Sequence, residues 1–134
     1  MRDKAFFDTN ILVYAIVKGD HRQDKALDLL SIGGVISVQV LNEFVYVVRR
    51  KAHMPWESVG ESLEWLRFLC PNPLSVSIKT HEEALRIARR YGYQIYDSVV
   101  IASALEANCD VLYSEDLQDG QTIEGRVKIR NPFL

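Results

Sequence analysis

A polar triplet interrupts an apolar run near the N-terminus, and this interruption constrains the fold more than any other feature. Residues 5–14 read AFFDTNILVY, so Asp8, Thr9 and Asn10 divide a stretch that is otherwise apolar. The apolar residues before Asp8 predict a buried strand, and those after Thr9 predict the helix that follows it. Asp8 then lies at the carboxyl end of a parallel strand, where open α/β sheets place their ligand crevice. The alternative is that Asp8 or Thr9 only caps the helix.

Length and composition indicate a single domain over residues 1–134. A chain of 134 residues with 48% hydrophobic residues is long enough to bury one core and too short for two ordinary domains. Cys70 and Cys109 have neither metal-binding nor redox spacing, which predicts buried thiols in a reduced, cytoplasmic protein. No signal-peptide cleavage site and no membrane-spanning stretch are visible. We therefore expect a protein that stays where it is made and has no membrane partner.

Strands and helices alternate along the remaining chain. The pattern predicts strands over residues 35–37, 74–78, 110–114 and 127–130 and helices over residues 21–32, 38–50, 55–70, 80–91 and 95–108. The helix from residue 38 is expected to be buried nearly all round, and Thr80 is expected to begin a capping box. The strand over 127–130 carries cations on one face, as edge strands do. This alternation predicts a three-layer α/β/α domain with a mostly parallel central sheet.

Three further carboxylates occupy positions that need a physical reason. Glu43 lies inside an apolar helix, where an ionised glutamate is costly unless it pairs, for example with Arg49 or Arg50, or binds a metal ion. Asp97 begins a mostly apolar helix, and the alternative is that it serves only as the N-cap of this helix. Asp116 follows a predicted strand and can be an ordinary turn residue. Together with Asp8, however, these side chains can converge on one crevice at the carboxyl edge of the sheet.

Four converging carboxylates need something to offset their mutual repulsion. They either take up protons or bind a hard divalent cation. His21, His53 and His81 lie at polar positions, so only oxygen ligands are available, and these select Mg²⁺ or Mn²⁺ rather than zinc. A cation held in this way binds phosphoryl oxygens and lowers the pKa of a water molecule. The pattern therefore predicts phosphodiester hydrolysis.

A polyanionic substrate also requires basic side chains near the crevice. The formal net charge of −2 argues against binding by overall attraction, but it leaves room for local basic patches. Each basic run is also typical of a solvated face or a helix end. The candidate RNA-binding residues are Arg49, Arg50, Arg86, Arg89 and Arg90, with a further basic run over residues 126–130.

Four motifs give the chain a resemblance to a known family. They are FDTNIL at residues 7–12, QVLNEF at 39–44, YDS at 96–98 and LYSEDLQDG at 112–120. In this order they resemble the PIN-domain family, in particular the VapC-type toxins of bacterial toxin–antitoxin pairs. The resemblance covers nearly the whole chain, and the four motifs are specific only when they are taken together.

The resemblance implies a PIN-like nuclease domain over residues 1–134 that acts as a Mg²⁺- or Mn²⁺-dependent ribonuclease. It also implies a cognate antitoxin that inserts a segment into the active-site groove. Asn10 and Ser114 match supporting residues that orient a carboxylate or a metal-bound water. Asp119 is an extra acidic candidate in the same loop, and the alternative is that it is an ordinary turn residue. The acidic quartet, expected to be both catalytic and metal-binding, is Asp8, Glu43, Asp97 and Asp116.

Two other functions and one further partner remain open from the sequence. A phosphatase with an aspartyl nucleophile is one rival, although Asn10 stands where such enzymes commonly carry a second aspartate. A non-catalytic module that binds RNA or protein is the other. Trp65 and Phe68 lie off the apolar stripe of the helix over 55–70, which favours a homodimer formed through the helical hairpin, although a second core face also explains them.

Overall fold

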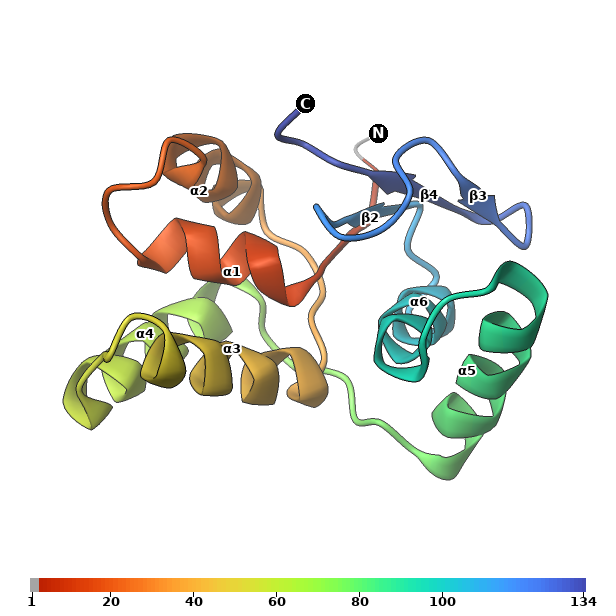
Figure 1. Cartoon of the computed structure of the whole chain (residues 1–134), viewed down its shortest axis with the longest axis horizontal. Helices are drawn as coiled ribbons and strands as arrows, with labels where there is room; N and C mark the ends of the chain where they lie inside the picture. The colour runs from red at the N-terminus through yellow and green to blue at the C-terminus, as the bar shows by residue number, and fades with distance from the viewer. Residues whose placement is uncertain (1–2) are drawn as a thin grey trace.

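The computed structural model describes residues 3–134, and Figure 1 shows its arrangement. Helices make up most of this part of the chain, and the strands are short. In chain order the elements are β1 (Ala5–Phe7), α1 (Thr9–Ile16), α2 (Gln23–Ile32), α3 (Val38–Arg50), α4 (Trp56–Leu69), α5 (Ile78–Tyr91), α6 (Ile95–Glu106), β2 (Val111–Tyr113), β3 (Thr122–Ile123) and β4 (Val127–Arg130).

The four strands form one mostly parallel sheet in the order β1-β2-β4-β3. β2 pairs in parallel with both β1 and β4, whereas β3 is antiparallel to β4. Phe7 pairs with Tyr113, so β1 and β2 end side by side and the residues that follow them meet at one edge. The predicted α/β fold with a mostly parallel sheet is confirmed.

The prediction that residues 127–130 form an edge strand was wrong. β4 lies between β2 and β3, because β3 pairs with the side of β4 that faces away from β2. A tight hairpin at Glu124 and Gly125 connects β3 with β4. Both residues have positive φ angles, 54° and 64°, as the two central positions of a type I′ turn require. The predicted alternation is correct: Val127 and Ile129 are buried, while the cationic side chains that alternate with them, Lys128 and Arg130, are exposed.

Two groups of helices flank the sheet. In Figure 1, α1 to α4 lie to the left of the strands, and α5 and α6 lie below them. α6 packs against β2 and α5, and most of its side chains are buried. The largest buried side chains include Phe6, Phe44 and Leu112, and the two cysteines are free and buried, as expected. Within residues 3–134, no helix has the length and the apolar character needed to cross a bilayer.

The predicted strands over residues 35–37 and 74–78 are not regular strands. Val35 makes a single bridge to Phe6, and Ser37 makes one to Leu74. The second of these segments ends early because α5 begins at Ile78, capped by Ser77 rather than by Thr80. Ser77 Oγ accepts from Thr80 N at 3.2 Å, and Thr80 Oγ1 accepts from Ser77 N at 3.1 Å. The capping box therefore exists three residues before the predicted one.

The sequence predicted that helix α3 is buried nearly all round, and this prediction was wrong. The helix is amphipathic. Only Val40, Phe44 and Val48 are fully buried, at the spacing of one helical stripe. Tyr46 lies on another face and is 61% exposed. The run of β-branched and aromatic residues concealed this periodicity, because their apolar character does not tell which of them face the core.

Candidate metal centre

Asp8 and Ser114 form the buried base of the site. The parallel register continues beyond the strands, since Asp8 N donates to Tyr113 O at 3.0 Å. Asp8 is buried, its Oδ1 accepts from Thr9 N at 2.7 Å, and its Oδ2 accepts from Ser114 Oγ at 2.7 Å. Asp8 therefore caps α1 and also lies at the carboxyl edge of the sheet, so the two interpretations of this residue are both correct.

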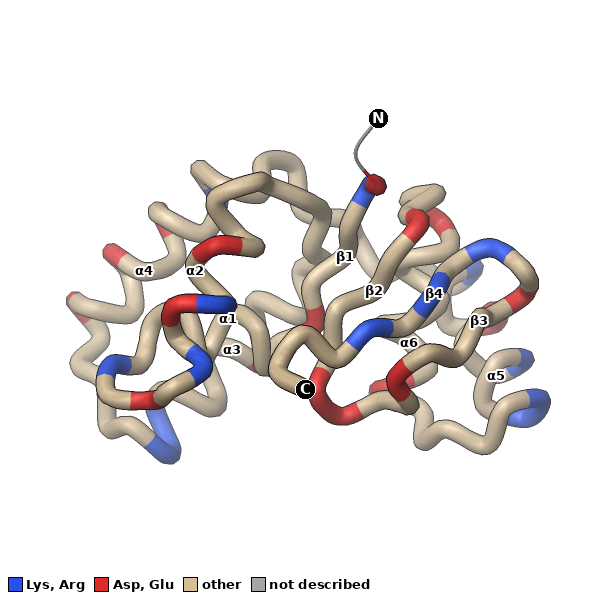
Figure 2. Tube along the Cα trace, turned by 90° about the horizontal axis from the view of Figure 1, so that it is seen from above, with Lys and Arg blue, Asp and Glu red and all other residues tan. Residues whose placement is uncertain are grey.

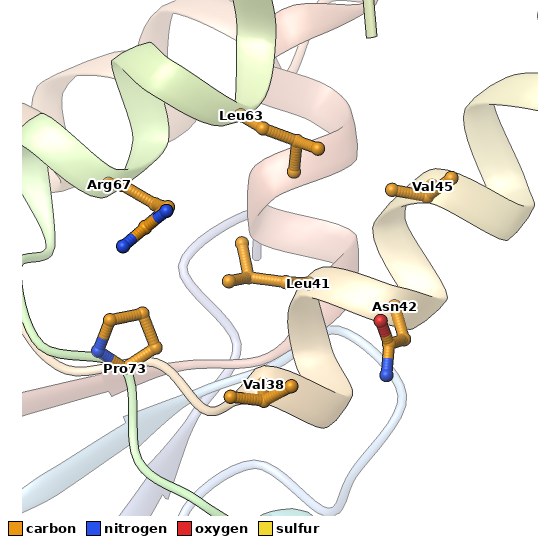
Figure 3. A pocket seen from close by; sticks show the side chains of 7 residues that line it. All are labelled: Val38, Leu41, Asn42, Val45, Leu63, Arg67 and Pro73. Carbon is orange, nitrogen blue, oxygen red and sulfur yellow. The ribbon is translucent and has the colours of Figure 1, made fainter. Parts of the chain in front are cut away.

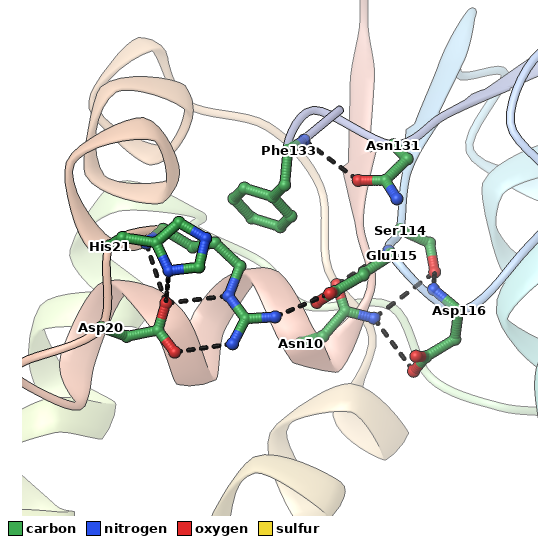
Figure 4. A network of polar contacts seen from close by, with 9 residues as sticks. Asn10, Asp20, His21, Ser114, Glu115, Asp116, Asn131 and Phe133 are labelled. Atoms are coloured by element: carbon green, nitrogen blue, oxygen red, sulfur yellow. Dashed lines mark hydrogen bonds and ion pairs between the residues drawn. The ribbon is translucent and has the colours of Figure 1, made fainter.

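Asn10 connects Asp8 with the loop that carries Asp116. Its Nδ2 lies 3.2 Å from Asp116 Oδ2 and 3.5 Å from Asp8 Oδ2, and its Oδ1 accepts from Glu115 N at 3.2 Å. Ser114 Oγ accepts in turn from Asp116 N at 3.1 Å. Figure 4 shows Asn10, Ser114 and Asp116 facing one another. The structure thus brings Asp8, Asn10, Ser114 and Asp116 together.

Asp97 reaches the same site from α6, and it is not the N-cap of this helix. The cap is Gln94, whose side chain accepts from Tyr96 N at 2.8 Å. Asp97 therefore lies inside the first turn, where its half-buried carboxylate has no capping role. This placement removes the structural alternative that the sequence left open for Asp97.

Three of the carboxylates repel one another. Burial raises the pKa of Asp8 from 3.8 to about 6; hydrogen bonds from Ser114 and Thr9 act against this rise, and the charges of Asp116 and Asp97 add to it. Burial likewise raises the pKa of Asp97, with a hydrogen bond from Gln94 acting against it and the charge of Asp116 adding to it. Figure 2 shows acidic positions directly after both β1 and β2. Within residues 3–134, no cationic side chain forms an ion pair that offsets the charge of these three carboxylates.

Glu43 adjoins this group through a threonine that the sequence analysis treated only as a possible cap. Thr9 Oγ1 donates to Glu43 Oε2 at 2.9 Å, so α3 is fastened to the start of α1. Arg49 and Arg50 do not pair with Glu43. Their guanidinium groups donate instead to Met54 O and Tyr46 Oη, at 2.9 and 2.8 Å. The ion pair within α3, which the sequence left open as the alternative to metal binding, is therefore not formed.

The donor set fits a hard divalent cation. The charged groups of the site itself, Asp8, Glu43, Asp97 and Asp116, are carboxylates, and the hydroxyl and amide groups beside them supply further oxygens, which are the ligands of Mg²⁺ and Mn²⁺. As the side chains stand, no three carboxylate, histidine or cysteine groups within residues 3–134 are close enough to enclose an ion. The Asn10 amide donates to both Asp8 and Asp116, and a cation bound beside these carboxylates would offset their repulsion further.

A salt-bridge network that the sequence did not reveal holds the loop carrying Asp116. Arg22 Nη1 lies 2.7 Å from Glu115 Oε1, and its Nε and Nη2 lie 2.8 and 2.7 Å from the two Asp20 oxygens. These contacts tie the loop to the turn between α1 and α2 (Figure 4). Arg22 and Glu115 are 93 positions apart in the sequence, so no local pattern could have predicted their pairing.

The other candidate residues lie in different surroundings. Arg86 and Arg90 both pair with Glu124, at 2.5 Å, and Arg86 also pairs with Glu83 at 2.8 Å, so carboxylates neutralise these cations. Asp119 Oδ1 accepts from Asn131 N at 2.8 Å, which favours the turn interpretation of Asp119. The RNA-binding role of the arginines on α5 stays a prediction.

A separate groove lies between α3 and α4. It has a volume of about 440 Å³, and Figure 3 shows the side chains that line it. Arg67 is the charged residue of the lining, which contains no carboxylate; the lining residues are Val38, Leu41, Asn42, Val45, Leu63, Arg67 and Pro73. This groove lacks the ligands for a divalent cation and is distinct from the acidic site.

The Ser114 hydroxyl should be needed to orient Asp8. If Asp8 holds a divalent cation that acts in phosphodiester hydrolysis, Ser114→Ala should lower the rate roughly 10- to 100-fold, as loss of a group that orients a metal ligand does. Ser103→Ala is the matched control, because Ser103 is equally buried and its hydroxyl has no partner. Its activity should stay within about twofold of the wild type. Equal rates for the two variants in a steady-state assay of phosphodiester hydrolysis, the reaction predicted from the sequence, would contradict the role of Ser114.

Comparison with known proteins identifies relatives of this fold. The sequence matches the family model described as PIN domain over residues 5–118. No curated protein matches the sequence.

Several solved structures are similar along most of the chain. A toxin–antitoxin complex from Klebsiella pneumoniae has a TM-score of 0.71 and 23% identity, covering 96% of this chain and 98% of the other. VapC20 of Mycobacterium tuberculosis, a sarcin–ricin loop cleaving toxin, has a TM-score of 0.69 and 18% identity, with 84% of this chain and 92% of the other covered. VapBC2 from Rickettsia felis, bound to a fragment of promoter DNA, has a TM-score of 0.67 and 21% identity, with 95% and 98% covered.

Proposed function

Because the chain belongs to the PIN domain family, we propose that it is a metal-dependent endoribonuclease and the toxin of a toxin–antitoxin pair. The observation that carries this proposal is the group of repelling carboxylates at the ends of β1 and β2. Asp8 is buried and interacts with Asp97 and Asp116, which come from other parts of the sequence. Burying such charge is costly unless a cation offsets it.

The residues of the site fall into two groups in this proposal: the carboxylates that hold the cation and the polar residues that orient them. Asp8, Glu43, Asp97 and Asp116 hold Mg²⁺, or Mn²⁺ in its place. The bound cation lowers the pKa of a water molecule and offsets the charge of the phosphodiester. Ser114 and Asn10 fix the orientations of Asp8 and Asp116, and Thr9 fixes Glu43. Hydrolysis leaves a 3′-hydroxyl and a 5′-phosphate.

We expect RNA cleavage by the purified protein to depend on a divalent cation. Mn²⁺ or Mg²⁺ should support internal cleavage, and removing the cation with EDTA should lower the rate at least about 100-fold, because the cation supplies several kcal/mol of charge stabilisation. Electrophoresis of labelled RNA measures the rate, and the chemistry of the product ends identifies the reaction. Cleavage that persists in EDTA would refute the proposal, as would an inactive protein with both ions.

The partners of the protein follow from the same proposal. RNA is the substrate, and a cognate antitoxin covers the acidic site in the cytoplasm. The similar solved structures include toxin–antitoxin complexes, and a small DNA-binding protein encoded in the neighbouring reading frame would support this assignment. A second copy of the chain packs on α4, where Phe68 is 82% exposed and Trp65 is partly exposed.

The phosphatase alternative has less support. Asn10, two residues after Asp8, donates its amide to Asp116 and accepts from the backbone of Glu115. It supplies no second carboxylate to act as an acid beside a nucleophilic Asp8. A covalent phosphoaspartate trapped at Asp8 would revive this alternative.

A further inference from the structure

Two exposed aromatic rings lie beside two arginines where α3 ends and α4 begins. We call this surface the arginine–aromatic patch; it consists of Tyr46, Arg49, Arg50 and Trp56. Tyr46 is 61% exposed and Trp56 is 64% exposed. Large aromatic side chains usually bury much of their surface, so two that remain this exposed, each beside one of two consecutive arginines, indicate a surface that contacts a ligand.

One arginine guanidinium lies near each aromatic ring of the patch, and each ring still has solvent-exposed surface. The Arg50 guanidinium lies 5.7 Å from the centre of the Tyr46 ring, and its Nη1 donates to Tyr46 Oη at 2.8 Å. The Arg49 guanidinium lies 4.3 Å from the centre of the Trp56 ring, and its Nη1 donates to Met54 O. These contacts fix the planes of the rings and the positions of the charges, which lowers the entropy lost when a ligand binds.

The charges of the patch are not neutralised by the protein. Within residues 3–134 no carboxylate forms an ion pair with Arg49 or Arg50, whereas Arg86 and Arg90 on α5 both pair with Glu124. The chain as a whole has a formal net charge of −2. A polyanion must therefore be attracted locally, and the patch offers cations that are available for it.

Two of the four patch residues, Tyr46 and Arg50, lie on the same face of α3 as Glu43. Glu43, Tyr46 and Arg50 are spaced i, i+3 and i+7, which places them on the same side of the helix. With a rise of about 1.5 Å per residue, Tyr46 lies about one turn and Arg50 about two turns beyond Glu43. A strand bound on this face therefore leads directly to the proposed catalytic carboxylates.

We propose that the arginine–aromatic patch binds a single-stranded segment of the RNA substrate. An unpaired base stacks on Tyr46, a second stacks on Trp56, and Arg50 contacts a phosphate. Paired bases cannot stack in this way, because their faces are covered by neighbours in the duplex. The inference rests on the proposed ribonuclease function and names the form of RNA that the enzyme accepts: a loop, bulge or end.

The test measures RNA binding in a variant that does not cleave. Asp97→Asn serves as the parent, with Mg²⁺ present, and fluorescence anisotropy follows an unstructured labelled RNA of about 12 nucleotides and a duplex of the same sequence. Adding Tyr46→Ala should weaken single-strand binding roughly tenfold, the scale of one lost stacking contact, and should change duplex binding little. Tyr46→Phe keeps the ring and should stay within about threefold of the parent.

A matched control removes an exposed apolar side chain elsewhere. Ile78 lies in the first turn of α5 and is largely exposed, and Ile78→Ala should leave the affinity for either RNA unchanged. Circular dichroism of each variant shows whether it is folded. A loss of affinity in Tyr46→Ala with retained helix content supports the inference.

Several outcomes would overturn the inference, and they separate it from the proposed function. If wild-type protein cleaves RNA but Tyr46→Ala binds single strands as tightly as its parent, the patch is not an RNA site and the ribonuclease proposal stands. The same holds if Tyr46→Ala weakens only the binding of the purified cognate antitoxin, because the patch is then a protein-docking surface. If wild-type protein neither binds nor cleaves RNA, the proposed function fails, and this inference fails with it.

Discussion

Replacing Asp97 with asparagine is expected to lower RNA cleavage at least about 100-fold while the protein stays folded. The substitution keeps the shape of the side chain and removes one charge from the proposed ligand set, which should cost more than the loss of an outer orienting group. The helix should not be affected, because Gln94 rather than Asp97 caps α6. Initial rates in Mn²⁺ measure the effect, and circular dichroism checks the fold.

The control for this variant is an aspartate at the opposite end of β2. Asp110 is exposed, and its Oδ2 accepts from Lys4 N at 2.9 Å, far along the strand from Ser114. The Asp110→Asn variant should cleave RNA at a rate within about twofold of the wild-type rate, as expected for a surface substitution away from the site. If Asp97→Asn retains cleavage, or if both variants lose it equally, the assigned role of Asp97 is wrong.

Asp8→Asn is expected to abolish cleavage and to make the metal-free protein more stable. Burial and the neighbouring carboxylates raise the pKa of Asp8 from 3.8 to about 6, so keeping it ionised at neutral pH costs free energy. This difference corresponds to about 3 kcal/mol at most. Asparagine has no such cost and retains an oxygen to accept from Thr9 N. The melting temperature in EDTA should therefore rise by several degrees.

The same shift predicts how stability depends on pH. Between pH 3.8 and about 6 the native protein binds more protons at Asp8 than the unfolded chain does. The contribution of Asp8 to the free energy of unfolding therefore falls as the pH rises through this window and is constant above it. In Asp8→Asn this contribution is absent, so the gain in stability over the wild type should be small near pH 4 and full at pH 7.

Divalent cations should reverse the order of stability. A cation that binds only the native wild type raises its melting temperature, and the variant that lacks Asp8 should respond much less. Asp28→Asn, at an exposed position of α2, should behave like the wild type in every condition. Differential scanning calorimetry with EDTA and with Mn²⁺ measures all three proteins. A destabilised Asp8→Asn in EDTA would show that Asp8 is not held as an uncompensated charge.

The strongest features of the sequence were those whose chemistry is local. The apolar run ending at Asp8 indicated both the strand and the cap of the helix that follows it, and the structure has both. The parallel register of β1 and β2 then explains why Asp8 and Ser114 meet, although 106 positions separate them. Residues that follow parallel strands can be predicted to lie close together, because the carboxyl ends of parallel strands lie on the same side of the sheet.

Features that depend on packing could not be predicted in this way. The apolar run of α3 concealed its exposed face, because a sequence of valines does not tell which side meets the core. Ser77 and Thr80 are both good capping residues, and only the start of α5 decides between them. Thr9 and Arg22 act through partners that are distant in the sequence, Glu43 and Glu115. Such pairs become visible only when the chain is folded.

The most direct test of the central claim is to locate Mn²⁺ in a crystal of the protein. The anomalous signal of manganese identifies the ion independently of the assumed ligands. We predict a peak at the carboxyl ends of β1 and β2, within coordination distance of Asp8, Asp97 and Asp116, and no peak there in Asp97→Asn. Crystals grown with saturating Mn²⁺ that show no ion at this edge, or that bind it only elsewhere on the surface, would contradict the account.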